Sequence, residues 1–229
     1  MHVRTSYLQT AVTAIILGAA GAPCVPLAQA GGKAMPANAK SHGKSLSEWM
    51  KLYFQWAVGG PDESGPQVDF LPLPSGVETG GSWTVDDPGV LEGSLDVALS
   101  PGTSFVLPVS AATRERYTDG HLDDPYPDSI FADSDYKVTL DGKVLLEKAP
   151  GGLSPWYVFP QQYNPPVVYA EPTSYDSVAT EWVQGYCFTC PPLQPGVHVL
   201  KLHSTIIIAD WDLGIQYENT WTITVAPPH

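Results

Sequence analysis

The alternating stretch at residues 215–225 constrains the fold more than any other part of the chain. Its odd positions are apolar and its even positions polar, except at Asn219. Successive side chains of a strand point to opposite faces, so the pattern predicts a strand with one buried and one solvated face. Such a strand needs a second layer over its apolar face. The apolar residues are Ile215, Tyr217, Trp221, Ile223 and Val225, and the polar ones are Gln216, Glu218, Thr220, Thr222 and Thr224.

Short strand patterns separated by turn residues recur from residue 67 onward. Asp141-Gly142 between residues 136–140 and 143–147 is a strong signal for a two-residue β-hairpin. Many short strands with proline and glycine turns predict an all-β fold, a single β-sandwich of the jelly-roll or immunoglobulin-like kind. Further strands are expected at residues 68–71, 82–85, 91–99, 104–109, 197–203 and 205–209, with weaker patterns at 156–159, 167–170 and 182–188.

One N-terminal amphipathic helix is predicted ahead of these strands. Ser45 is a suitable N-cap, Glu48 completes a capping box, and Gly59-Gly60-Pro61 ends the helix. The helix carries an aromatic stripe, Trp49, Tyr53 and Trp56. Such a stripe can pack on the sandwich or form a ligand platform, and packing is the commoner role.

The first thirty residues have the features of a signal peptide. Arg4 precedes an apolar segment at residues 11–20 that is too short to cross a bilayer, and Ala28-Gln29-Ala30 is a suitable cleavage site. We therefore expect a signal peptide at 1–30, a flexible arm at 31–44, and a helix plus β-sandwich domain at 45–229. This division predicts a secreted or periplasmic protein with no membrane span.

The charge of the chain argues against two classes of partner. Lys and Arg number 11 against 24 Asp and Glu, which gives a net charge of −13. Such an acidic protein repels nucleic acid and anionic lipid, so neither is expected to bind.

The segment from 117 to 135 is the most acidic part of the chain. Calcium binds six to eight oxygen atoms, several of them from carboxylates, on a loop that wraps around the ion. The spacing does not fit an EF-hand, and a solvated acidic loop is the alternative interpretation. The candidate calcium ligands are Asp119, Asp123, Asp124 and Asp128.

Residues 156–186 read as a long, loop-rich region with many aromatic residues and prolines. Aromatic rings on rigid loops suit the apolar faces of sugars, and side-chain amides can hydrogen-bond their hydroxyl groups. The alternative is that these rings pack over the sandwich. The candidate ligand-binding residues are Trp156, Gln162, Tyr163, Asn164, Tyr169 and Trp182. A catalytic carboxylate pair, either Asp176 with Glu181 or Glu171 with Glu181, is a weaker hypothesis.

Cys187 and Cys190 form a C-x-x-C motif followed by Pro191-Pro192. The prolines forbid the helix that a redox-active motif normally opens, and His198 and His203, five positions apart, face opposite sides of one strand and cannot share a zinc ion. In an oxidising compartment the motif therefore predicts a local disulfide.

Several of these segments resemble a loose family of uncharacterised exported bacterial proteins. The resemblance is carried by the Trp49/Trp56 helix, by Pro101-Gly102-Thr103 before residues 105–108, and by Leu140-Asp141-Gly142. Residues 192–198 and 217–225 share it too. It implies an exported β-sandwich and brings no known reaction.

The sequence leaves three functions open. The first is a non-catalytic exported binding protein for an extracellular glycan or cell-surface polymer. The second is an extracellular glycan-active enzyme that uses carboxylates of residues 171–181. The third is a structural or adhesive envelope protein stabilised by calcium.

Overall fold

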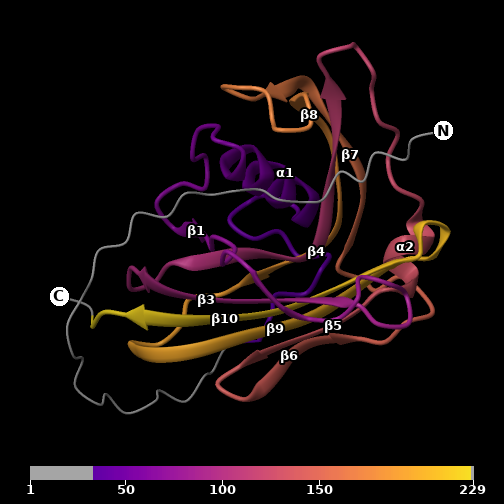
Figure 1. The fold of residues 1–229 in the computed structure, drawn as a ribbon. Helices are drawn as coiled ribbons and strands as arrows, with labels where there is room; N and C mark the ends of the chain where they lie inside the picture. The colour runs from indigo at the N-terminus through magenta and orange to yellow at the C-terminus, as the bar shows by residue number, and fades with distance from the viewer. Residues whose placement is uncertain (1–32, 228–229) are drawn as a thin grey trace.

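A computed structural model describes residues 33–227 as two packed β-sheets with a helix on one outer face (Figure 1). The six-stranded sheet has the order β2 (Val77–Gly80), β3 (Gly89–Leu99), β10 (Leu213–Val225), β9 (Gly196–Ile208), β5 (Asp135–Leu140) and β6 (Lys143–Lys148). The four-stranded sheet has the order β1 (Val68–Phe70), β4 (Ser104–Tyr117), β8 (Ser177–Cys190) and β7 (Tyr157–Val168). The predicted single β-sandwich is confirmed.

The two strongest local patterns in the sequence, the alternating strand and the two-residue hairpin, form the structures that they predict. Strand β10 covers the alternating stretch, and its odd residues Trp221, Ile223 and Val225 are buried. Asp141 and Gly142 connect β5 to β6 and have φ angles of 50° and 76°. Positive φ at both turn residues matches the twist of the flanking strands, which is why this dipeptide favours a hairpin.

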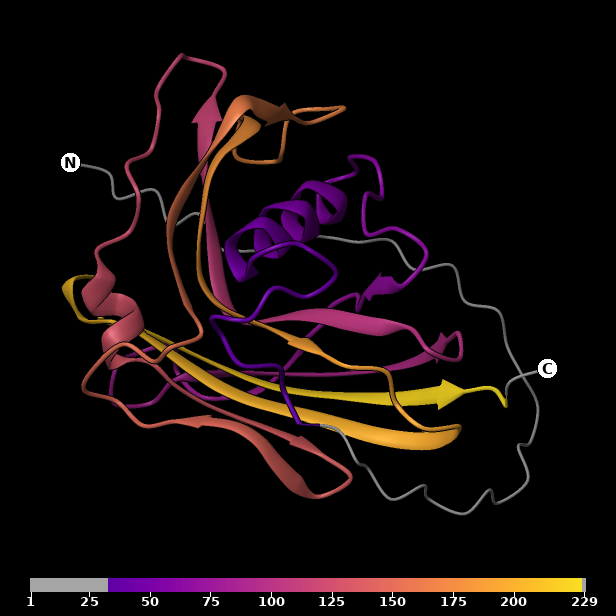
Figure 2. The ribbon, with the colours of Figure 1, turned by 180° about the vertical axis from the view of Figure 1, so that it is seen from behind.

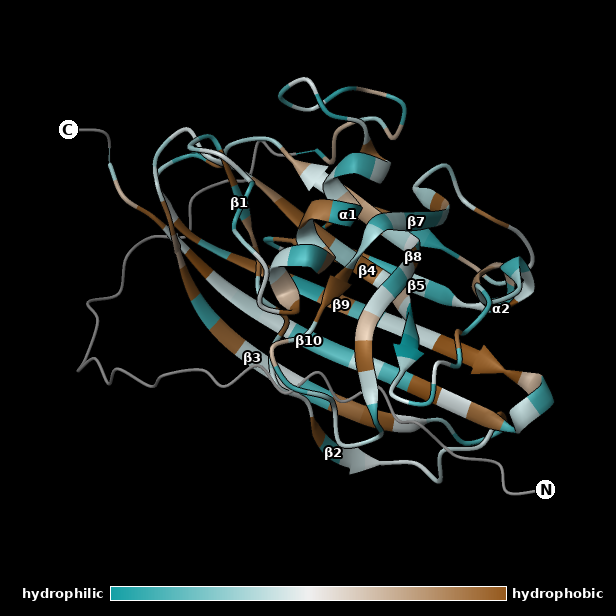
Figure 3. Cartoon of the chain, turned by 90° about the horizontal axis from the view of Figure 1, so that it is seen from above, coloured by the Kyte–Doolittle hydropathy of each residue, from teal (hydrophilic) through white to brown (hydrophobic). Residues whose placement is uncertain are grey.

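The main core fills the space between the two sheets. Phe105 and Leu107 from β4, together with Phe188 from β8, meet Leu200 of β9 and Trp221 of β10 there. Bands of hydrophobic and hydrophilic residues alternate along β3, β9 and β10, as Figure 3 shows. The apolar half of each of these strands therefore faces the core, and the polar half faces away from it.

Helix α1 (Leu46–Ala57) lies against the outer face of the four-stranded sheet (Figure 2). Its capping box is formed: Ser45 Oγ accepts from Glu48 N, and Glu48 accepts from Ser45 N at 2.7 Å. The hydrogen bond from the Ser45 backbone holds the pKa of Glu48 below its usual value. Trp49 and Tyr53 are buried against Phe70 of β1, so the aromatic stripe packs on the sheet.

Two predicted irregular segments are ordered parts of the domain. The stretch from 156 to 186 is not a loop region, because it forms most of β7 and β8. Residues 33–44 do not form a free arm, since Met35 N donates to Thr189 O and Trp49 Nε1 donates to Ser41 O, both at 2.9 Å. The predicted signal peptide at 1–30 lies outside the described residues.

A second, short helix, α2 (Asp128–Asp133), and a 3-10 turn, η1 (Ala209–Trp211), lie at one end of the sandwich (Figure 1). Within the described part of the chain, the helices are too short or too polar to cross a bilayer.

Candidate functional site

The outer face of the six-stranded sheet carries a row of charged side chains that crosses five strands. The strand register places these residues side by side, in the order Glu147, Lys137, His203, Glu218 and Glu92. Neighbouring strands are about 4.8 Å apart, so the row is roughly 19 Å long. No helix covers this face in the part of the chain that the structure describes (Figure 2).

His203 is the centre of the row. Its Nδ1 lies 2.6 Å from Glu218 Oε1, and its Nε2 lies 3.5 Å from Asp135 Oδ1. Gln216 Nε2 donates to the same Glu218 oxygen at 2.9 Å. The contact with Glu218 orients the imidazole ring, and the Asp135 carboxylate lies near its second nitrogen.

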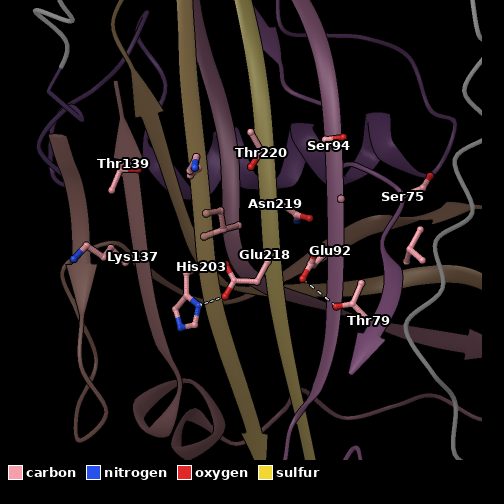
Figure 4. Close-up of a pocket in the computed structure, with 14 residues that line it drawn as sticks. Ser75, Thr79, Glu92, Ser94, Lys137, Thr139, His203, Glu218, Asn219 and Thr220 are labelled. Carbon is pink, nitrogen blue, oxygen red and sulfur yellow. Dashed lines mark hydrogen bonds and ion pairs between the residues drawn. The ribbon is translucent and has the colours of Figure 1, made fainter. Parts of the chain in front are cut away.

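A second row beside the first is rich in hydroxyl groups. Thr139, Lys201, Thr220 and Ser94 are in register across β5, β9, β10 and β3. The Lys201 side chain forms no ion pair with any described residue. Apart from Glu147, the residues of the two rows line one open groove of about 680 Å³, which also includes Ser75 and Thr79 (Figure 4).

Two carboxylates stand next to each other in the groove. Glu218 and Glu92 are register partners on the parallel strands β10 and β3, and Figure 4 shows them on the same face. Glu92 Oε1 accepts from Thr79 Oγ1 at 3.1 Å. Like charges in adjacent cross-strand positions cost stability, and a ligand rich in hydrogen-bond donors would relieve this repulsion.

The six predicted ligand-binding residues do not form one surface. Tyr163 is buried under α1, and its hydroxyl donates to Lys51 O at 2.8 Å. Tyr169 donates its hydroxyl to Glu115 at 2.8 Å, and Trp156 packs against the main core. Burial raises the pKa of both tyrosines above the usual value. Gln162 and Asn164 are exposed on β7, and Trp182 is half-buried in β8.

The structure does not bring the four predicted calcium ligands together. Asp123 pairs with Arg114 at 3.3 Å, Asp128 accepts from Tyr157 at 2.6 Å, and Asp119 accepts from the His121 backbone at 2.9 Å. Asp124 is exposed, and its carbonyl accepts from Arg114 Nε at 2.7 Å. Residues 33–227 hold no group of three or more His, Cys, Asp or Glu side chains in a metal-binding arrangement.

The predicted disulfide between Cys187 and Cys190 is wrong. Both residues lie in β8 and are free thiols. They are three positions apart, so Cys187 joins the cluster under α1 and Cys190 joins the core between the sheets. Burial raises the pKa of Cys190 to about 12 and that of Cys187 further. Such thiols are chemically inert in the folded protein.

The predicted catalytic carboxylates are also separated by their environments. Glu181 is buried in β8 and accepts from Arg116 Nε at 2.6 Å, whereas Glu171 and Asp176 are exposed between β7 and β8. His198 is buried and contacts Asp141 at 2.8 Å, so it faces away from His203 as their spacing predicts.

Sequence reasoning missed the groove. The groove could have been predicted from the polar residues of the alternating strand, above all Glu218 and Thr220. Lys201 and His203, which point outward from the preceding strand, belong to the same pattern. Comparison with known proteins adds no candidate: no family model matches the chain, and no curated protein matches it significantly.

Proposed function

We propose that this protein is an exported, non-catalytic binding protein whose ligand is a glycan or another hydroxyl-rich cell-surface polymer. The observation that carries the proposal is the groove on the uncovered outer face of the six-stranded sheet. It presents hydroxyl groups, two adjacent carboxylates and the ammonium of Lys201, which has no ion-pair partner within residues 33–227, along one face. These groups donate and accept hydrogen bonds with the hydroxyl groups of an extended chain.

The groove is open rather than enclosed, which also favours binding over catalysis. Glycoside hydrolysis needs a carboxylic acid and a second carboxylate in a site that orients one bond. Glu218 is already engaged by His203 and Gln216, and Glu181 is engaged by Arg116. A binding role needs only that the ligand displaces water from side chains held by a rigid sheet.

The test is a steric block with a matched control on the same strand and face. Thr220→Trp places an indole in the groove, whereas Thr224→Trp places one on the same face of β10 outside the groove. An array of neutral and charged glycans identifies a ligand, and calorimetry then measures its affinity for each variant.

We expect Thr220→Trp to weaken binding at least tenfold while Thr224→Trp binds like the wild type, with both keeping the wild-type melting temperature. Equal binding by both variants would show that the ligand binds outside the groove, and an array without hits would reject the proposal. Release of reducing ends from a bound glycan would favour the enzyme instead.

A further inference from the structure

The turn between β9 and β10 presents an indole to solvent at one end of the sandwich. Trp211 lies in η1, and its side chain is 55% exposed. The turn is fixed on the loop before β3: Asp212 Oδ1 accepts from Val85 N, and Gly214 N donates to Trp83 O, both at 3.2 Å. Because these contacts fix the backbone of the turn, the turn cannot readily move to bury the Trp211 ring.

A second ring, Tyr126, is held beside Trp211. The two ring centroids are 6.2 Å apart with the planes at 65°. The Tyr126 backbone is fixed by the fully buried Gln184, which accepts from Tyr126 N at 3.0 Å and donates to Tyr126 O at 2.8 Å. The Arg114 guanidinium lies 4.2 Å from the centroid of the Tyr126 ring. These contacts hold Tyr126 in place before any ligand arrives.

Acidic and basic groups surround the two rings. Asp210 and Asp212 flank Trp211 in the chain and are exposed. Arg114 is held by Asp123 at 3.3 Å, so its charge is partly balanced within the protein. Carboxylates accept hydrogen bonds from hydroxyl groups and repel phosphate and other anions. The surroundings therefore favour a neutral ligand with many hydroxyl groups.

We propose that Trp211 and Tyr126, here called the aromatic rim, bind one ring of a neutral saccharide. The apolar C–H face of the sugar stacks on the Trp211 indole, and its hydroxyl groups bond to the carboxylates of Asp210 and Asp212. Stacking on a fixed aromatic ring removes apolar surface from water at a low entropic cost. The rim lies at the end of the strands and shares no lining residue with the groove, so it is a separate site.

The rim is tested by calorimetry of the full chain with neutral hexaoses of glucose, mannose and N-acetylglucosamine. The variant is Trp211→Ala, and the matched control is Phe159→Ala, which removes another exposed ring on β7. We expect Trp211→Ala to weaken binding of the preferred hexaose at least tenfold, Trp211→Phe to keep part of the affinity, and Phe159→Ala to bind normally. Melting temperatures should stay at the wild-type value, because the removed indole is exposed.

The outcomes separate the rim from the groove. If the hexaose binds and only Thr220→Trp weakens it, the rim proposal is wrong and the groove proposal stands. If no neutral hexaose binds the wild type, the rim proposal is wrong, while charged glycans still test the groove. A Trp211→Ala variant that changes only self-association would likewise overturn the rim, because the indole would then be a protein contact.

Discussion

The two sheets of the sandwich differ in what covers their outer faces. The outer face of the four-stranded sheet is apolar, with Val106, Val183 and Cys187 under helix α1. The outer face of the six-stranded sheet carries charged and hydroxyl side chains and stays open. Burial of apolar surface stabilises a fold by about 25 cal/mol per Å². A helix over the apolar outer face of the four-stranded sheet therefore stabilises the protein, whereas one over the polar outer face of the six-stranded sheet would not. A ligand can therefore contact the open face without disturbing the core.

The largest loss of stability is expected when an indole is removed from the helix that covers the four-stranded sheet. Trp49 lies in the first turn of α1, and its side chain is fully buried between the helix and the sheet. Trp49→Ala should lower the free energy of unfolding by about 3–5 kcal/mol, because it leaves a cavity and removes the hydrogen bond from the indole to the Ser41 carbonyl. Urea unfolding followed by circular dichroism measures the change, with the exposed Trp211→Ala as control. A loss below about 1 kcal/mol would show that α1 is not part of the core.

The covered face should also make the protein sensitive to alkali. Burial raises the pKa of Tyr53 from 10.0, so the folded chain keeps a proton that the unfolded chain loses. The resulting stability is complete below pH 10 and falls above it by about 1.4 kcal/mol per pH unit for each such tyrosine.

We therefore expect the stability of Tyr53→Phe to fall less steeply above pH 10 than that of the wild type. Unfolding in urea at several pH values from 9 to 11.5, on the order of half a unit apart, measures both slopes. Identical slopes would mean that Tyr53 is accessible to hydroxide in the folded state.

A smaller loss in the free energy of unfolding is expected when a thiol is replaced by a hydroxyl group. Cys187 lies under α1, and Cys187→Ser buries a hydroxyl group among apolar side chains. The cost should be about 1–3 kcal/mol. Alkylation of the native protein should leave the peptide with Cys187 and Cys190 unmodified, and alkylation in urea should modify both. Recovery of that peptide with an intact disulfide would contradict the structure.

The smallest change in the free energy of unfolding is expected from a substitution on the open face. Lys201 points outward from β9 and has no ion-pair partner among the described residues. Lys201→Ala should change the free energy of unfolding by less than about 0.5 kcal/mol, because surface substitutions away from caps and networks rarely do more. Thermal unfolding is the measurement. A larger loss would show that the groove residues also stabilise the sheet, and that binding and stability are coupled there.

Features that depend only on residues close together in the chain could be predicted from the sequence. The alternation at 215–225 fixed which side of β10 is buried, Asp141-Gly142 fixed a hairpin, and Ser45 with Glu48 fixed the start of α1. Each rests on backbone geometry or on hydrogen bonds within a few residues, so no knowledge of the fold is needed. Together they were enough to predict a sandwich with one helix.

The structure of the middle of the chain, by contrast, depends on contacts between residues that are distant in the sequence. Strand β8 is buried on both faces, so it shows no alternation. The preceding strand, β7, contains three prolines among its aromatic residues, a composition that is typical of a loop. Strand β8 places Cys187 and Cys190 on opposite sides, and the aromatic rings of β7 and β8 are divided between two clusters. The groove likewise depends on which strands become neighbours, because Glu92 and Glu218 lie far apart in the chain and meet only through the pairing of β3 with β10. Pairing between distant strands is a property of the whole fold, and no local pattern encodes it.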